Sequence, residues 1–251
     1  MSRILLVAQD TSAIGKSTVT RALAECVPDA PIYEVESSRH LVELAERVRH
    51  FAIRTERKRL DETGGEAAIA EYDTALNRML TEPLPAIVDV GANGGVSFLE
   101  ALAQMAPAFA RRGKQLGVLI VVAHKDDAYA TGRAIAAVTK GWAAARFLVV
   151  NHLHGEPDAG EIKALSKGAR TVTTLAKFSF PTRALPVIAP LGLALIPKLD
   201  EDALAGHLAR DGAEPDVAMA IRTRGLLDAF RLAAMQAVEP AARWLIDADK
   251  A

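Results

Sequence analysis

Short apolar runs rich in β-branched residues recur along the chain. They lie at residues 3–8, 31–35, 85–90, 116–123 and 146–151. An unbroken apolar run of this length is typical of a strand that is buried on both faces. We therefore predict five such strands.

Stretches rich in Ala, Leu, Arg and Glu with helical periodicity separate these runs, at residues 16–27, 38–62, 66–81, 97–112 and 127–141. Alternating strands and helices predict an α/β fold of three layers, with a mostly parallel central sheet and helices on both faces. After residue 151 the pattern is less regular. We prefer residues 169–178 as a sixth strand, with 193–199 as its rival, and predict a helix over 216–238.

Composition limits the classes of protein that fit. The 251 residues are 50% hydrophobic with a formal net charge of -1. We expect one domain over residues 1–251, with a helical part from about 200 to 251 packed on it. Balanced charge gives no overall attraction to nucleic acid or anionic lipid, so such a partner needs a local patch.

Cys26 is the only cysteine, which excludes a disulfide framework and a cysteine zinc site. The N-terminal residues do not resemble a secretory signal, so we expect a cytoplasmic protein. The longest apolar segments, 116–123 and 185–197, are shorter than a membrane span, and we expect no membrane association.

The segment QDTSAIGKSTVT, residues 9–20, joins the first predicted strand to the first predicted helix. Backbone amides of such a loop and helix start can surround a phosphate. Lys16 would neutralise the terminal phosphates, and the Ser17 hydroxyl would reach a magnesium ion. Gly15 suits this role because a side chain there would block the phosphate.

The full phosphate-loop pattern G-x-x-x-x-G-K-[ST] is broken, because Asp10 occupies its first glycine position. A carboxylate facing a triphosphate is repulsive, so we expect Asp10 to point away or to contact the metal. The alternative is structural: Ser12 caps the helix and Lys16 is a solvated residue of its first turn.

Acidic residues end two further predicted strands. Asp89, in PAIVDVGANGG, can hold magnesium through a water, and the glycines after it allow the loop to change shape. The alternative is a turn that needs glycines for steric reasons alone. Glu36, in EVESS, would orient an attacking water, or else serve as a carboxylate at a helix N-terminus.

Asn151 ends the strand FLVVN, where its amide can offer a donor and an acceptor to the edge of a base. Asparagine is also common where strands turn. The nearby His124, His152 and His154 lack helical metal-ligand spacing, so we interpret them as solvated or core histidines.

In order and spacing, TSAIGKSTV, EVE, IVDVGANGG and VVN resemble the ParA/MinD family of ATPases, which have deviant phosphate loops of the K-G-G-x-G-K-[ST] type. Within that family, EYDTALNRML and PAIVDVGANGGVSFLEAL are similar to the TraL-like proteins of conjugative plasmids. The resemblance covers residues 1 to about 155 and implies the P-loop NTPase fold.

The resemblance implies ATP and Mg²⁺ as cofactors. The nucleotide would be contacted by loop and helix residues and by one strand end: Thr11, Ser12, Ala13, Ile14, Gly15, Lys16, Ser17, Thr18 and Asn151. Catalytic roles would fall to Lys16, Glu36 and Asp89, with magnesium held at Ser17 and Asp89.

This sequence departs from the family where the loop opens. The family's first lysine, which reaches the partner's nucleotide in the ATP-bound dimer, corresponds to Thr11, and its two glycines to Ser12 and Ala13. The departure argues against fast hydrolysis and the usual sandwich dimer, unless another cation such as Arg39 substitutes.

The first functional hypothesis is an ATP-dependent, slowly hydrolysing switch in plasmid partition or conjugative DNA transfer, with a nucleotide-dependent homodimer and DNA or a DNA-processing protein as partner. Its candidate DNA contacts are basic residues late in the chain, which a solvated helix face explains equally well: Arg170, Lys177, Arg183, Arg222, Arg224 and Arg231.

Two alternatives remain. QDTSAIGKST also resembles the T-D-T-x-V-G-K-T loop of dethiobiotin synthetase with a slip of one residue, which implies an ATP-dependent ligase of the same fold. The third hypothesis is a degenerate module that binds nucleotide without hydrolysis.

Overall fold

The computed structural model describes residues 1–53, 66–92, 94–188, 192–209 and 214–247, and only the backbone of 66–70. In this part of the chain a sheet has the order β3-β2-β4-β1-β5-β6-β7, and every pair of neighbouring strands is parallel. The strands are β1 (Ser2–Ala8), β2 (Ile32–Glu36), β3 (Val48–Ala52), β4 (Ala86–Val90), β5 (Lys114–Ala123), β6 (Ala145–Asn151) and β7 (Thr171–Leu175).

Helices connect these strands and cover both faces of the sheet. They are α1 (Lys16–Cys26), α3 (Glu66–Thr81), α4 (Gly95–Arg111), α5 (Asp126–Thr139), α6 (Ala159–Leu165), α7 (Leu185–Ile188), α8 (Glu201–Leu208) and α9 (Val217–Ile246). Short 3₁₀ turns occupy Val42–Leu44, His152–His154, Thr182–Ala184 and Leu193–Lys198. The predicted fold class, a three-layer α/β fold with a parallel sheet, is confirmed.

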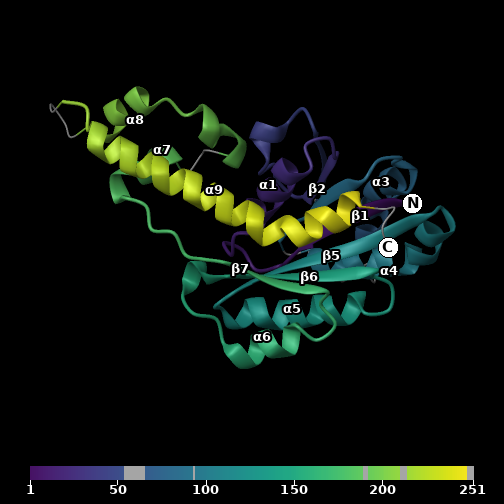
Figure 1. The fold of residues 1–251 in the computed structure, drawn as a ribbon. Helices are drawn as coiled ribbons and strands as arrows, with labels where there is room; N and C mark the ends of the chain where they lie inside the picture. Colours follow the sequence, from purple (N-terminus) through teal and green to yellow (C-terminus); the bar gives the residue numbers. More distant parts are fainter. Residues whose placement is uncertain (54–65, 93, 189–191, 210–213, 248–251) are drawn as a thin grey trace.

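Two hydrophobic clusters fill the space on either side of the sheet. Along β1, Leu5 and Val7 face the cluster that α1 and α9 cover, whereas Ile4 and Leu6 face the cluster beneath α3, α4 and α5. In Figure 1, α1 and α9 lie on one side of the sheet, and α5 and α6 lie on the other. Burial on both faces explains why the central strands read as unbroken apolar runs.

One sequence prediction is wrong. Within the helix predicted over 38–62, residues Val42–Leu44 form a 3₁₀ turn and Val48–Ala52 form β3; residues 54–62 lie outside the described part. β3 is an edge strand, mostly half-exposed, and its sequence VRHFA lacks a long apolar run. Pairing with the free edge of β2 decides its conformation.

The C-terminal region settles two other predictions. The preferred sixth strand is confirmed as β7, and its rival, 193–199, is mainly a 3₁₀ turn. The predicted helix 216–238 continues as α9 to Ile246, with Pro240 inside it. Buried residues beyond the proline, among them Trp244 and Leu245, pack on the core and hold the helix together there. No helix among the described residues is long and apolar enough to cross a membrane.

Candidate functional site

The carboxyl ends of β1, β2, β4 and β6 lie along one edge of the sheet, and the loops that follow them form the candidate site. Ligands of open parallel sheets bind outside this edge. β1 lies at the centre, between β4 and β5, so the loop after Ala8 emerges next to the residues that end β4.

Gln9 holds the start of this loop in place. Its side chain is completely buried, and its amide donates to the carbonyls of Val121 (2.9 Å) and Ala128 (3.1 Å). Its Oε1 accepts from the backbone amides of Asp10 and Thr11. Gln9 was not among the predicted site residues, although a polar residue directly after a buried strand was the available signal.

Two positive φ angles shape the rest of the loop. Ala13 has φ 55°, and Gly15, directly before α1, has φ 89°. Alternating left-handed and right-handed residues turn successive amides to the same side and make a concave anion site. A side chain at Gly15 would also collide with Asn151, because Nδ2 of that residue lies against the position that a Cβ would take. Glycine is therefore required here for conformation and for space.

Asn151 fastens the loop to the end of β6. Its Nδ2 donates to the Ile14 carbonyl over 2.8 Å, and its Oδ1 accepts from the Leu153 amide over 3.1 Å. The residue is only 5% exposed. One donor and one acceptor of the amide are thus used within the protein, and recognition of adenine by Asn151 stays a prediction.

Lys16 and Asp89 are the central charged pair. The Lys16 ammonium lies 2.7 Å from Asp89 Oδ1, and their side chains are 10% and 3% exposed. The structure therefore brings together the predicted phosphate-binding lysine and the predicted metal-binding carboxylate, although they are 73 positions apart in the chain. The pair neutralises a carboxylate that would be costly to bury alone.

A pocket of about 330 Å³ opens over this loop. The predicted nucleotide-contacting residues 11–18 all line it, together with Glu36 at the end of β2 and with His40 and Ala92 from neighbouring loops. The pocket lies at the start of α1, where the positive end of the helix dipole favours an anion. The site is therefore open to a ligand and suited to a negatively charged one.

Asp10 has a structural role at the position where the phosphate-loop pattern has its first glycine. Its carboxylate accepts from the amides of Gly95 (2.6 Å) and Val96 (3.3 Å) at the start of α4. Burial raises the pKa of Asp10 above its ordinary value of 3.8, and the two hydrogen bonds oppose that shift. Burial and the nearby Asp10 charge also raise the pKa of Tyr72 to about 12. The Asp10 carboxylate is therefore occupied by hydrogen bonds from the amides at the start of α4.

Glu36 ties the end of β2 to the loop after β4. It is 9% exposed, and its carboxylate accepts from the amides of Ser37 (3.1 Å) and Ala92 (3.0 Å). Its carboxylate therefore holds the loop that follows Asp89, and Glu36 also lines the pocket. Orientation of a water by Glu36 stays a prediction.

The structure adds two basic residues that the sequence analysis did not place near the loop. Lys125 Nζ lies 3.5 Å from the Ser12 carbonyl, and His154 Nε2 lies 2.7 Å from the Ala13 carbonyl. Both follow strands that end at the same edge, β5 and β6. Arg39, named as a substitute cation, lines a separate small cavity beside Glu34. No group of three or more metal-ligating side chains occurs among the described residues.

The candidate DNA-binding residues do not share one set of surroundings. Three form ion pairs: Arg183 with Asp216, Arg224 with Asp228, and Arg231 with Glu25. The other three, Arg170, Lys177 and Arg222, are exposed and have no ion pair in the described part of the chain. Their role in DNA binding stays a prediction.

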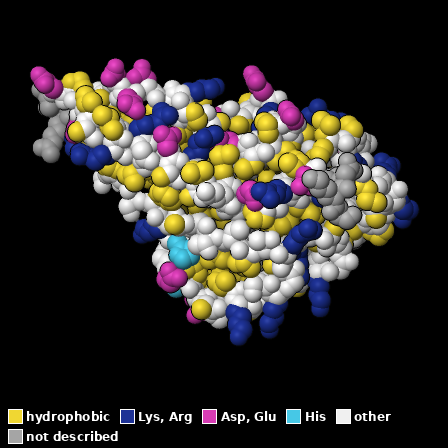
Figure 2. Space-filling view, in the orientation of Figure 1, with side chains coloured by type: hydrophobic (Ala, Val, Ile, Leu, Met, Phe, Trp, Pro, Cys, Tyr) yellow, Lys and Arg dark blue, Asp and Glu magenta, His cyan; other side chains and the backbone are white. Residues whose placement is uncertain are grey.

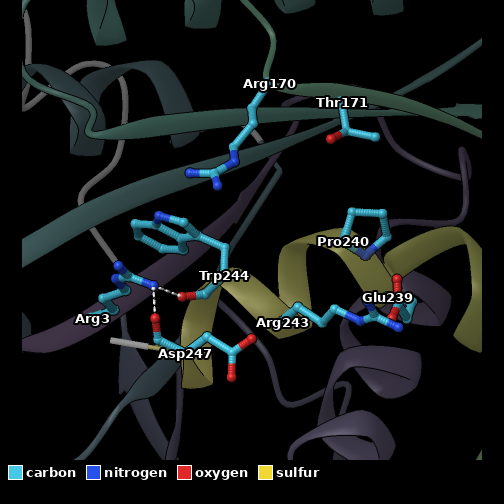
Figure 3. Close-up of a pocket in the computed structure, with 8 residues that line it drawn as sticks. All are labelled: Arg3, Arg170, Thr171, Glu239, Pro240, Arg243, Trp244 and Asp247. Carbon is cyan, nitrogen blue, oxygen red and sulfur yellow. Dashed lines mark hydrogen bonds and ion pairs between the residues drawn. The ribbon is translucent and has the colours of Figure 1, made fainter. Parts of the chain in front are cut away.

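A second pocket, of about 310 Å³, lies at the opposite edge of the sheet. In Figure 3, Trp244 lies between Arg170, which reaches toward it from above, and Arg3, which lies below it. Arg3 is 2% exposed and donates to the carbonyls of Trp244 and Asp247. Its guanidinium thus satisfies the last carbonyls of α9 and stands at the negative end of that helix.

Comparisons with known proteins find structures but no relatives by sequence. No protein-family model matches the chain, and no curated protein matches it. Among solved structures, the MinD cell division protein of Aquifex aeolicus matches with 13% identity. The alignment covers 89% of this chain and 97% of that one, with a TM-score of 0.43.

Proposed function

We propose that the protein is an ATP-binding, slowly hydrolysing molecular switch. The observation that carries this proposal is the pocket over residues 11–18, where the start of α1 presents Lys16 beside the buried carboxylate of Asp89. A strand, a concave loop of amides and a helix start that carries lysine and then serine form the phosphate site of P-loop proteins.

The Lys16–Asp89 ion pair can exchange one partner when a ligand binds. A triphosphate offers Lys16 a more highly charged partner than Asp89, so binding moves the ammonium to the terminal phosphates. Asp89 then loses its cation. A carboxylate and a hydroxyl are hard oxygen donors that suit Mg²⁺, so Asp89 and Ser17 would hold the ion, which neutralises charge on the phosphates when bound.

Two carboxylates link this pocket to α4 and the loop before it, which we propose to move when nucleotide binds. Asp10, in the phosphate loop, holds the first amides of α4, and Glu36 holds the Ala92 amide in the loop before α4. A shift of the phosphate loop on binding therefore pulls directly on the start of α4. This linkage makes α4 and its preceding loop the candidate moving part.

The ParA/MinD type, and within it a TraL-like role in plasmid partition or conjugative transfer, is proposed from the sequence motifs. The same proposal includes a nucleotide-dependent homodimer, a cytoplasmic location and DNA or a DNA-processing protein as partner. Lys125, whose Nζ lies 3.5 Å from the Ser12 carbonyl, is our candidate to replace the lysine that the family has at the position of Thr11.

Titration with ATP, with and without Mg²⁺, tests the site in the parent protein, in Lys16→Ala and in the surface control Lys140→Ala. Loss of a charged hydrogen bond to phosphate should weaken binding by about 10- to 100-fold in Lys16→Ala. The control should bind like the parent. Equal affinity in Lys16→Ala and the parent would refute the proposed nucleotide site.

Turnover of ATP in the presence of double-stranded DNA then tests the switch. Slow turnover that DNA stimulates, and that Lys125→Ala reduces, supports the partition or transfer role. Magnesium-dependent binding with no turnover, with or without DNA, favours the second candidate, a nucleotide-binding module without hydrolysis. The observation in favour of that candidate is Thr11, which is 8% exposed and uncharged where the family has lysine.

A further inference from the structure

One face of α9 is exposed over the first half of the helix. Its exposed residues are spaced symmetrically on either side of Gly225. The exposed residues between positions 217 and 232 are Val217, Ala218, Ile221, Arg222, Gly225, Asp228, Ala229 and Leu232. Apart from Val217, they lie three, four or seven residues to either side of Gly225. Residues at these spacings share one face of a helix.

This face is more apolar than a solvent-exposed helix face normally is. Val217 is 50% exposed, Ile221 54% and Leu232 58%, and only Arg222 and Asp228 carry charge. Figure 1 shows that the first half of α9 projects beyond the sheet, and Figure 2 shows hydrophobic side chains along this part of the surface, with basic and acidic groups among them. A solvated helix face is normally polar.

No contact among the described residues requires glycine at position 225. Glycine in the middle of a helix is less stable than alanine. A Cβ at Gly225 would meet no described atom within 4 Å, whereas a Cβ at Gly132 of α5 would lie 3.1 Å from Val122. The fold therefore leaves room for a side chain at Gly225, and close approach of another helix is a reason to have none.

From these observations we infer that α9 binds the same face of α9 in a second copy of the chain. The two helices cross antiparallel about a two-fold axis at Gly225. In such an isologous contact, a residue three positions before the axis meets the partner residue three positions after it. The same rule applies at four and at seven positions.

The residues on this face complement one another under that rule. Arg222 meets the partner's Asp228, so each contact holds two ion pairs. Arg222 has no ion pair among the described residues, and Asp228, although bonded to Arg224, keeps a side chain that is 51% exposed. Large groups meet small ones: Ile221 meets the partner's Ala229, and Leu232 meets the partner's Ala218. Charge and size thus both favour a second copy as the occupant.

The contact is small and does not involve the phosphate pocket. One pair of helices falls in the class of weak interfaces that bury less than about 1,200 Å². We therefore expect a reversible dimer that forms without nucleotide, and the inference does not depend on the proposed function. A dimer across the phosphate pocket would instead require nucleotide.

Charge exchange provides the sharpest test, by sedimentation velocity over a concentration series without nucleotide. Arg222→Asp places like charges opposite one another across the axis, and so does Asp228→Arg. Each alone should raise the dimer dissociation constant about tenfold or more. An equimolar mixture of the two variants should associate again, because the introduced carboxylate of one chain then meets the introduced guanidinium of the other. Failure of the mixture to associate would overturn the assigned register.

Substitutions at uncharged positions of α9 test whether this face forms the contact. Ile221→Glu should make the protein monomeric, and Ile246→Glu, at the far end of the same helix and 50% exposed, should leave the dimer intact. Gly225→Leu should also abolish the dimer while thermal unfolding occurs at the parent temperature or higher, because leucine favours the helix. A parent that is monomeric at all concentrations, or a dimer that Ile221→Glu leaves unchanged, overturns the inference.

Discussion

Asp89 at the carboxyl edge of the sheet and Arg3 at the amino edge are both 2% exposed, but they have different kinds of partner. Arg3 donates to the Trp244 and Asp247 carbonyls at the end of α9 and to Gln115 Oε1. Asp89 accepts from the flexible ammonium of Lys16. One charge is held mainly by two backbone carbonyls that cannot move without unfolding the end of a helix, and the other by a side chain that can move freely.

This difference separates a charge that stabilises the fold from one that, on the proposed function, takes part in binding. The two backbone partners of Arg3 are fixed, so these hydrogen bonds contribute to the folded state whatever the protein binds. The partner of Asp89 can move to a ligand that offers more negative charge, so the same kind of burial leaves an exchangeable pair. Four substitutions test the comparison, in order of expected effect on stability.

Arg3→Met should lower the free energy of unfolding by about 3 kcal/mol, because buried carbonyls at the end of α9 lose a charged donor. Nucleotide affinity should not change, since Arg3 lies at the other edge. Chemical denaturation and ATP titration measure the two effects. The exposed Arg112→Met is the control, with a change within about 0.5 kcal/mol. An equal loss in both variants would contradict the role given to Arg3.

Gly15→Ala should destabilise the protein by about 2 kcal/mol, through its positive φ and the collision with Asn151. It should also abolish ATP binding, because the loop amides can no longer face one point. Gly141→Ala is the matched control, since its added Cβ meets no atom of the described residues within 4 Å. Parent-like binding by Gly15→Ala would show that the loop geometry is unimportant.

Asp89→Asn should destabilise the protein by about 1 kcal/mol, because Lys16 keeps a hydrogen-bond acceptor but loses a charge. The variant should bind ATP without Mg²⁺ at least as tightly as the parent, because Lys16 is released more easily. The gain in affinity on addition of Mg²⁺ should disappear. Titration calorimetry checks both, with the exposed Asp73→Asn as control, and a retained magnesium effect would remove Asp89 from the metal site.

Asp10→Asn should change stability least at neutral pH, by less than about 1 kcal/mol, because the asparagine Oδ1 still accepts from the Gly95 amide and only the longer bond from Val96 is lost. Its effect is on pH dependence. Burial raises the pKa of Asp10 in the folded protein, so the folded state takes up the proton first as the pH falls. The parent should therefore gain stability relative to the variant from the raised pKa down to 3.8, the ordinary value.

Parallel unfolding curves from neutral pH to about pH 4 measure this difference. A parent that loses stability relative to Asp10→Asn over that range would show that the hydrogen bonds from Gly95 and Val96 outweigh burial.

Much of the site was predictable because it lies where strands end. Apolar runs located β1, β4 and β6, and parallel alternation placed their carboxyl ends on one edge. Lys16, Asp89 and Asn151 were then expected to lie near one another. The contacts of Gln9 and Lys125 were not predictable in this way. Gln9 bonds to carbonyls of β5 and α5, and Lys125 to the phosphate loop, and local sequence carries no information on these distant backbone groups.

The sequence by itself determined the layers, the positions of the main strands along the chain and the place of the loop between β1 and α1, because burial on both faces imposes an apolar pattern that can be read locally. Only the tertiary structure decided the conformation of β3, the partner of Asp10 and the length of α9. Each of these depends on a surface or a backbone group from a distant part of the chain. An edge strand, a capping carboxylate and a helix beyond a proline are stabilised by neighbours that local sequence does not reveal.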